Sequence, residues 1–116
     1  MSKLFSPTLL GDIPLGQGSF DLKRMVKTIR EARPDVRFAL ELITRDPLKV
    51  PCLTDEFYAT LPAASAIDLA RTMRFVHRNP AERLQEVSRL SLEEQVELED
   101  ENVRASIQYA GAELQL

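Results

Sequence analysis

Apolar residues first recur at helical spacing about twenty residues into the chain. A helix from about Asp21 to Ala32 is predicted by the apolar positions Leu22, Met25, Val26 and Ile29. Asp21 suits the N-cap position, and Phe20 before it can form a hydrophobic staple. Pro34 disfavours helical backbone at the residue before it, so we expect the helix to end there.

A different pattern follows in Val36–Ile43, where apolar residues alternate with other residues. One face of this segment is fully apolar and consists of Val36, Phe38, Leu40 and Leu42. The other face carries Arg37, Ala39, Glu41 and Ile43. Alternation with a period of two predicts a β-strand. A strand that packs on helices with one face and lines a polar interior with the other would show this pattern.

Three further helices are predicted in the second half of the chain. Thr54 can open a short helix to Leu61, and Ser65 can cap a helix that continues to Asn79, before Pro80. Ser91 and Glu94 form a capping box at the start of a long final helix, whose apolar face would hold Leu92, Val96, Val103, Ile107, Ala110 and Leu114. Residues 1–19 and 44–53 are rich in turn-forming residues and are interpreted as loops, while residues 81–89 stay unassigned.

The predicted elements contain one clear strand, and a strand needs a neighbour to pair its backbone donors and acceptors. The rest of the sequence offers no obvious partner for Val36–Ile43. Three possibilities therefore stay open: the strand pairs with another copy of the chain, it pairs with a different chain, or the sequence is a piece of a larger protein.

Composition and charge narrow the class of protein. The 116 residues are 44% hydrophobic and 28% charged, which is normal for one globular domain. A net charge of -3 argues against a dedicated nucleic-acid surface. The basic residues of segment 21–37 and the acidic residues of segment 93–101 are interpreted as solvated helix faces. A single cysteine, Cys52, and the absence of a signal-peptide pattern or a membrane span favour the cytoplasm.

Glu41 is the first candidate for chemistry, because it lies near the C-terminal end of the predicted strand on its non-apolar face. In parallel β/α barrels, residues at that end of a strand face the active site. A carboxylate there can bind a divalent cation or move a proton. The alternative, which the pattern alone favours, is a carboxylate that pairs with a neighbouring base such as Arg37 on the same face. Arg45 and Asp46 follow in the loop where substrate contacts would lie. For Asp46 the favoured interpretation is that Asp46-Pro47 only turns the chain.

Two other features are weaker candidates. Gly16-Gln17-Gly18 precedes a helix and can hold a phosphate or simply form a tight turn, and the second interpretation is favoured because no strand precedes it. His77 is the only histidine and lies near the end of a helix, where its position is explained by the helix dipole. One histidine and one cysteine do not make a structural zinc site.

The stretches Pro14-Leu-Gly-Gln-Gly-Ser-Phe-Asp-Leu22 and Arg37-Phe-Ala-Leu-Glu-Leu-Ile-Thr-Arg-Asp-Pro-Leu-Lys-Val-Pro51 resemble the C-terminal part of sugar phosphate isomerases and epimerases. These proteins belong to the xylose isomerase-like superfamily of TIM barrels. The resemblance implies that Val36–Ile43 is the last barrel strand and that Glu41 is a ligand of a divalent metal, either manganese, magnesium or zinc. The metal would polarise the sugar during isomerisation or epimerisation, with Arg45 and Asp46 contacting substrate.

The chain would cover only the end of such a barrel, without the strands that carry the other metal ligands. The expected fold is thus a helix-rich α/β fragment, with residues 1–19 as an N-terminal loop and 20–116 as one domain, completed by self-association or by a complementary N-terminal barrel chain. The metal is expected only if the barrel is completed. The alternative function is a non-catalytic, self-associating helical protein or an interaction module. Neither nucleic acid nor membrane is expected as a partner.

Overall fold

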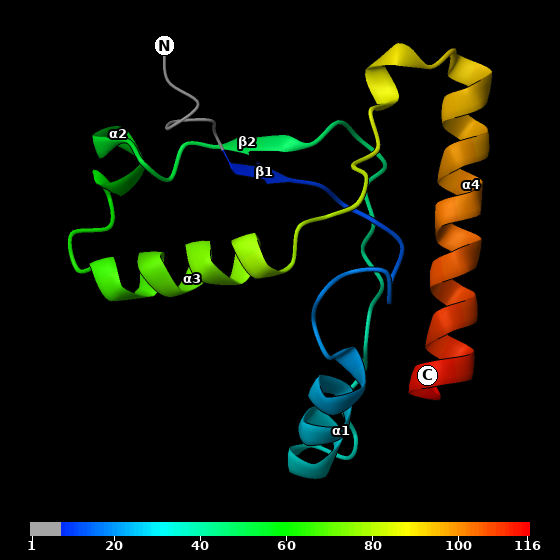
Figure 1. Cartoon of the computed structure of the whole chain (residues 1–116). Helices are drawn as coiled ribbons and strands as arrows, with labels where there is room; N and C mark the ends of the chain where they lie inside the picture. Colours follow the sequence, from blue (N-terminus) through cyan, green and yellow to red (C-terminus); the bar gives the residue numbers. More distant parts are fainter. Residues whose placement is uncertain (1–7) are drawn as a thin grey trace.

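The computed structural model describes residues 8–116 and contains helices together with one short β-ribbon (Figure 1). The part of the predicted N-terminal loop that covers residues 1–7 lies outside the described residues. In chain order, the elements are β1 (Thr8–Leu10), α1 (Leu22–Ala32), β2 (Leu48–Val50), α2 (Asp55–Tyr58), α3 (Ala66–Arg78), η2 (Val87–Arg89), α4 (Leu92–Tyr109) and the π-helical turn η3 (Ala110–Leu114). The expected helix-rich α/β character is confirmed.

The three longest helices begin at the positions that their capping residues predicted. The Asp21 carboxylate accepts a hydrogen bond from the backbone N–H of Arg24 at 3.0 Å, and α1 follows directly. Ser65 accepts from the N–H of Ile67 at the start of α3. At the start of α4 the reciprocal bonds of the capping box between Ser91 and Glu94 are both present. These side chains satisfy N–H groups that have no partner within a helix.

The predicted strand over residues 36–43 is wrong. This segment has no regular secondary structure and forms a long connection between α1 and β2 (Figure 1). Within residues 8–116, the backbone from residue 37 to residue 46 makes no hydrogen bond. The side chains do alternate, but no other segment of the described chain forms a hydrogen-bonded ladder with this one. A single strand without a paired neighbour is not stable.

The β-ribbon forms instead within the two segments predicted to be loops. β1 and β2 pair antiparallel, with Thr8 opposite Val50 and Leu10 opposite Leu48. Each strand is three residues long, too short to show an alternating pattern in the sequence. The ribbon and α3 together line an open hollow of about 510 Å³ with mainly apolar side chains.

The apolar face predicted for the last helix is buried only at its C-terminal end, at Leu114, and three of its other residues are exposed. Leu92, Val96 and Ile107 are 78%, 59% and 60% exposed, whereas Asn102 and Ser106 are the buried residues of α4. Ser106 accepts a hydrogen bond from the N–H of Leu15 at 2.9 Å, so a loop backbone lies directly on this side of α4. Small and polar side chains allow that close approach and supply the hydrogen bonds that a buried loop backbone requires.

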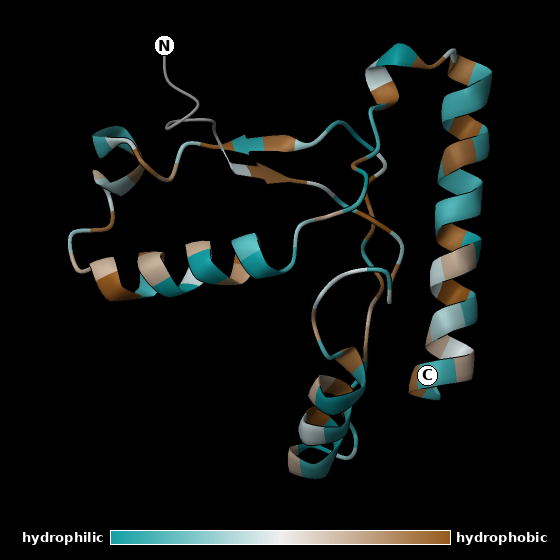
Figure 2. Ribbon diagram, in the orientation of Figure 1, coloured by the Kyte–Doolittle hydropathy of each residue, from teal (hydrophilic) through white to brown (hydrophobic). Residues whose placement is uncertain are grey.

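The described chain is open, with few fully buried apolar side chains. Val26, Val87 and Leu114 are the buried hydrophobic residues in this part of the chain, and apolar bands recur along the ribbons of α1, α3 and α4 (Figure 2). The radius of gyration is 17.2 Å, whereas a compact domain of this length has about 13 Å. Within residues 8–116, no helix combines the length and the apolar character that a bilayer span requires.

Candidate functional site

The predicted metal ligand Glu41 stands alone on the surface. It lies exposed in the irregular segment between α1 and β2. Residues 8–116 contain no group of three or more His, Cys, Asp or Glu side chains that could hold a metal ion. A single carboxylate does not hold a catalytic cation, so the donor set of the described residues does not fit the divalent metal that the resemblance implies.

The two predicted substrate contacts, Arg45 and Asp46, both bind partners within the chain. The Arg45 Nε donates to the Asp12 carboxylate at 2.8 Å, and both side chains are partly exposed. Asp46 Oδ1 accepts from the backbone N–H of Val87 at 2.5 Å and of Ser88 at 2.9 Å. Asp46 thereby joins the connection before β2 to η2, which leads into α4. A role for either residue in substrate binding stays a prediction.

These contacts make Asp46 a source of acid sensitivity. Hydrogen bonds from the side chain and backbone of Ser88 lower the pKa of the Asp46 carboxyl below its usual value. The stabilisation by the charged carboxylate is therefore complete above the unfolded-state pKa of about 4 and is lost as the pH falls through the lower folded-state pKa. We expect Asp46→Asn to be less stable than the wild type at neutral pH, with a difference that disappears in acid.

Chemical denaturation at a series of pH values measures this effect. The matched control is Asp35→Asn, since the Asp35 carboxylate is almost fully exposed. A difference between Asp46→Asn and the wild type that is the same at neutral and acidic pH would contradict the role of the Asp46 charge.

Gly16 and Gln17 belong to a tight turn, Pro14 to Gln17, that lies against α4. The N–H of Gln17 donates to the carbonyl of Pro14 at 3.1 Å, and Gly16 has a φ of 89°. A positive φ at this position of a four-residue turn is characteristic of a type II turn, which favours glycine. Gly16 also lies against the ring of Tyr109 in α4. These contacts support the tight-turn interpretation of this segment.

A buried amide near the middle of α4 holds three parts of the chain together. Asn102 donates to Thr44 Oγ1 at 3.1 Å and to Gln85 Oε1 at 2.8 Å, and it accepts from Gln85 Nε2 at 3.0 Å. Buried side-chain oxygen and nitrogen atoms in the described part of the chain all have a hydrogen-bond partner. The cluster is therefore satisfied internally, and we assign it a structural role.

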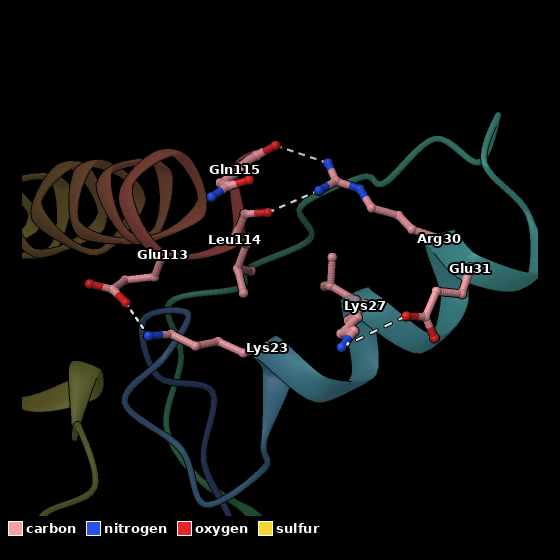
Figure 3. A pocket seen from close by; sticks show the side chains of 8 residues that line it. Lys23, Lys27, Arg30, Glu31, Glu113, Leu114 and Gln115 are labelled. Carbon is pink, nitrogen blue, oxygen red and sulfur yellow. Dashed lines mark hydrogen bonds and ion pairs between the residues drawn. The ribbon is translucent and has the colours of Figure 1, made fainter.

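The charged contacts of α1 gather where this helix meets η3 (Figure 3). Lys23 forms an ion pair with Glu113, and this contact raises the pKa of the lysine. Arg30 donates to the carbonyls of Leu114 at 3.2 Å and Gln115 at 2.9 Å, which satisfies carbonyl groups at the C-terminal end of η3. Lys27, between them on the same side of α1, makes only a long ion pair of 3.8 Å with Glu31.

An open apolar groove adjoins this charged edge. It has a volume of about 640 Å³ and runs between α1, residues 36–40 and the C-terminal residues of the described chain. The guanidinium of Arg30 lies 5.8 Å from the ring centre of Phe38, at the boundary of the groove. The apolar side chains that line it include Leu22, Met25, Ile29, Phe38, Leu40 and Leu116. Grooves of this size that combine apolar walls with a charged edge are common binding sites.

This groove did not emerge from the sequence alone, although part of its signal was present. Lys23, Lys27 and Arg30 are spaced by four and three residues, so they share one side of a helix. The contribution of residues 36–40 and 114–116 depends on how distant segments pack, and no local pattern reports it.

Comparison with known proteins does not assign the chain to a family. No family model matches the sequence, and neither a curated protein nor a solved structure matches it. The resemblance to the xylose isomerase-like superfamily therefore stays a prediction.

Proposed function

We propose that this protein is a self-associating interaction module, whose exposed apolar faces become buried between copies of the chain. The observation that carries the proposal is the exposed area. The accessible surface is 9890 Å², whereas a compact monomer of the same mass, 13.1 kDa, exposes about 6,400 Å².

The excess surface has the size and character of an interface. The difference of about 3,500 Å² is well above the roughly 800 Å² that each partner buries in a standard interface. Large apolar residues contribute to it from every helix longer than one turn, for example Phe20 beside α1, Ile67 in α3 and Leu92 in α4. Many large apolar side chains exposed on one chain are characteristic of a surface that associates.

Light scattering coupled to size-exclusion chromatography tests the proposal. We expect a mass of at least two chains at micromolar concentration, and a thermal midpoint that rises with protein concentration because association stabilises the folded chain. A monomer with a concentration-independent midpoint and cooperative unfolding would overturn self-association.

A second candidate is the one suggested by the sequence resemblance, an isomerase-like barrel completed by another chain. It is favoured by the unpaired backbone of residues 37–46 together with the alternating side chains of Val36–Ile43, since such a segment can add to a partner's sheet edge. On this hypothesis the remaining metal ligands come from the partner. A manganese titration of the assembled protein, compared with Glu41→Gln, separates the two functions.

A further inference from the structure

Two helices of this chain carry the same pattern of positions with opposite charge. Both have an apolar residue at the first and fifth positions, Leu22 and Val26 in α1 and Leu92 and Val96 in α4. Where α1 has cations, the first half of α4 has anions at equivalent positions: Lys23, Lys27 and Arg30 correspond to Glu93, Glu97 and Asp100. In each helix the three charges share one side, next to the apolar stripe.

The two patterns cannot meet within one chain. The end of α4 continues into η3, and η3 contacts α1. Since a helix rises 1.5 Å per residue, the position of Glu97 lies roughly 25 Å along the helix from Leu114, which is buried at that contact. The acidic half of α4 therefore extends away from α1 of its own chain (Figure 1).

We propose that the first half of α4 of a second copy docks beside α1, with its apolar residues in the groove and its acidic side along the cations of α1. This inference rests on the proposed self-association and names the surfaces that carry it. Each copy offers one groove and one acidic helix, and in this arrangement two copies related by a two-fold axis exchange the same contact twice.

The apolar part of this contact would bury side chains that are now in water. Leu92 and Val96 are largely exposed on α4, and Met25 and Ile29 are exposed where they line the groove. Mutual burial of these side chains would contribute to association through the hydrophobic effect.

The charges determine the direction of the docked helix. Viewed along each helix from its N-terminus, the charged side lies on the same side of the apolar stripe in α1 and in α4. When the two apolar stripes face one another, the two charged sides therefore meet only if the helices run antiparallel. The antiparallel arrangement places Lys27 opposite Glu97 at its centre, with Lys23 towards Asp100 and Arg30 towards Glu93. Lys23, Arg30 and Asp100 already have partners within their own chain, so the central pair carries the charge contact. A parallel arrangement would put the cations and anions on opposite sides of the contact.

The central pair, Lys27 and Glu97, is available for such a contact. The Lys27 side chain is 77% exposed and is held only by the long ion pair with Glu31. Glu97 is exposed on α4, and residues 8–116 give it no ion-pair partner. Lys23 and Arg30 have partners on η3 and are less suited to a test, because their replacement also disturbs the fold.

Charge reversal at this pair tests the inference on the full chain. We expect Lys27→Glu and Glu97→Lys to weaken self-association by about tenfold or more each, because each replaces an attraction with a repulsion at both symmetric contacts. The double variant Lys27→Glu/Glu97→Lys restores the pair with its polarity reversed and is expected to associate nearly as tightly as the wild type. Sedimentation equilibrium at low salt gives the dissociation constants, since salt screens the contact.

Matched controls carry the same charge changes elsewhere on exposed surface. Arg74→Glu in α3 and Glu82→Lys before η2 are expected to leave the dissociation constant unchanged. Circular dichroism of each single variant identifies any loss of folding, and the rescue by the double variant excludes such loss as the cause. If the wild type associates but the single variants associate equally well, or the double variant is not rescued, this docking arrangement is wrong. A monomeric wild type would overturn the proposed function itself.

Discussion

The Gly16→Ala variant is expected to lose about 2–5 kcal/mol of unfolding free energy, because two penalties add at one position. Gly16 has a φ of 89°, where a side chain is strained. A Cβ at Gly16 would also overlap with the Cε2 and Cδ2 atoms of the Tyr109 ring. Relief of this overlap requires the Tyr109 ring or the turn to shift, so we expect the turn to pack less closely on α4. Urea denaturation at fixed protein concentration measures the loss.

Another glycine of the same loop gives the control for this prediction. The nearest atom to a Cβ at Gly18 would be Ile13 Cδ1 at 4.0 Å, and Gly18 has no positive φ. Gly18→Ala is therefore expected to stay within about 0.5 kcal/mol of the wild type. Gly16→Ala in a Tyr109→Ala background separates the backbone strain from the clash, because only the strain remains there. Equal stability of Gly16→Ala and Gly18→Ala would contradict the packing of this turn on α4.

The second large effect is expected from Asn102→Ala, with a loss of about 2–4 kcal/mol. The variant removes three hydrogen bonds to Thr44 and Gln85, each of which contributes about 0.5–1.5 kcal/mol, and leaves polar groups of both partners unsatisfied. Because Asn102 joins α4 to the segments before β2 and before η2, we also expect increased amide exchange in both segments.

Gln108→Ala is the matched control for Asn102→Ala. It removes an amide from the same helix at an exposed position, and it is expected to change stability by no more than about 0.5 kcal/mol. Hydrogen exchange followed by mass spectrometry reports both segments in one experiment. If Asn102→Ala were as stable as Gln108→Ala, the amide cluster would not be the junction that the geometry describes.

The helices of this protein could be predicted because their signals are local. Asp21, Ser65 and Ser91 each precede an apolar repeat by one or two residues, and each caps a helix in the structure. A side chain that accepts a hydrogen bond from a backbone N–H two or three residues later needs no information from elsewhere in the chain.

The strand and the buried face of α4 could not be predicted, because both depend on distant neighbours. The alternating residues of Val36–Ile43 are compatible with a strand, but a strand also requires a second backbone with which to form hydrogen bonds. On α4, the apolar repeat of Leu92 and Val96 predicted that these residues lie on the buried face, but both are exposed in the structure. The inner face contains Asn102 and Ser106 because a loop, rather than a hydrophobic layer, packs there.

For the candidate site too, local features could be predicted from the sequence, whereas contacts between distant segments could not. The predicted site depends on a strand that has Glu41 near its C-terminal end and is followed by Arg45 and Asp46. Without that strand, the three residues do not form one site. Arg45 and Asp46 contact Asp12 and the η2 backbone instead. The repeated spacing of cations in α1 was visible in the sequence, but the groove beside it depends on residues 36–40 and 114–116.

The pairing of β1 with β2 has a consequence for how the chain folds. The two strands enclose the whole of residues 11–47 between Leu10 and Leu48, so they are not a hairpin that can form early by itself. The length of this enclosed segment alone contributes about 3 kcal/mol of closure entropy, more than a ribbon of three residues per strand can offset. We therefore infer that the ribbon forms late in folding, after other contacts have brought its strands together, and that contacts of high sequence separation limit the folding rate.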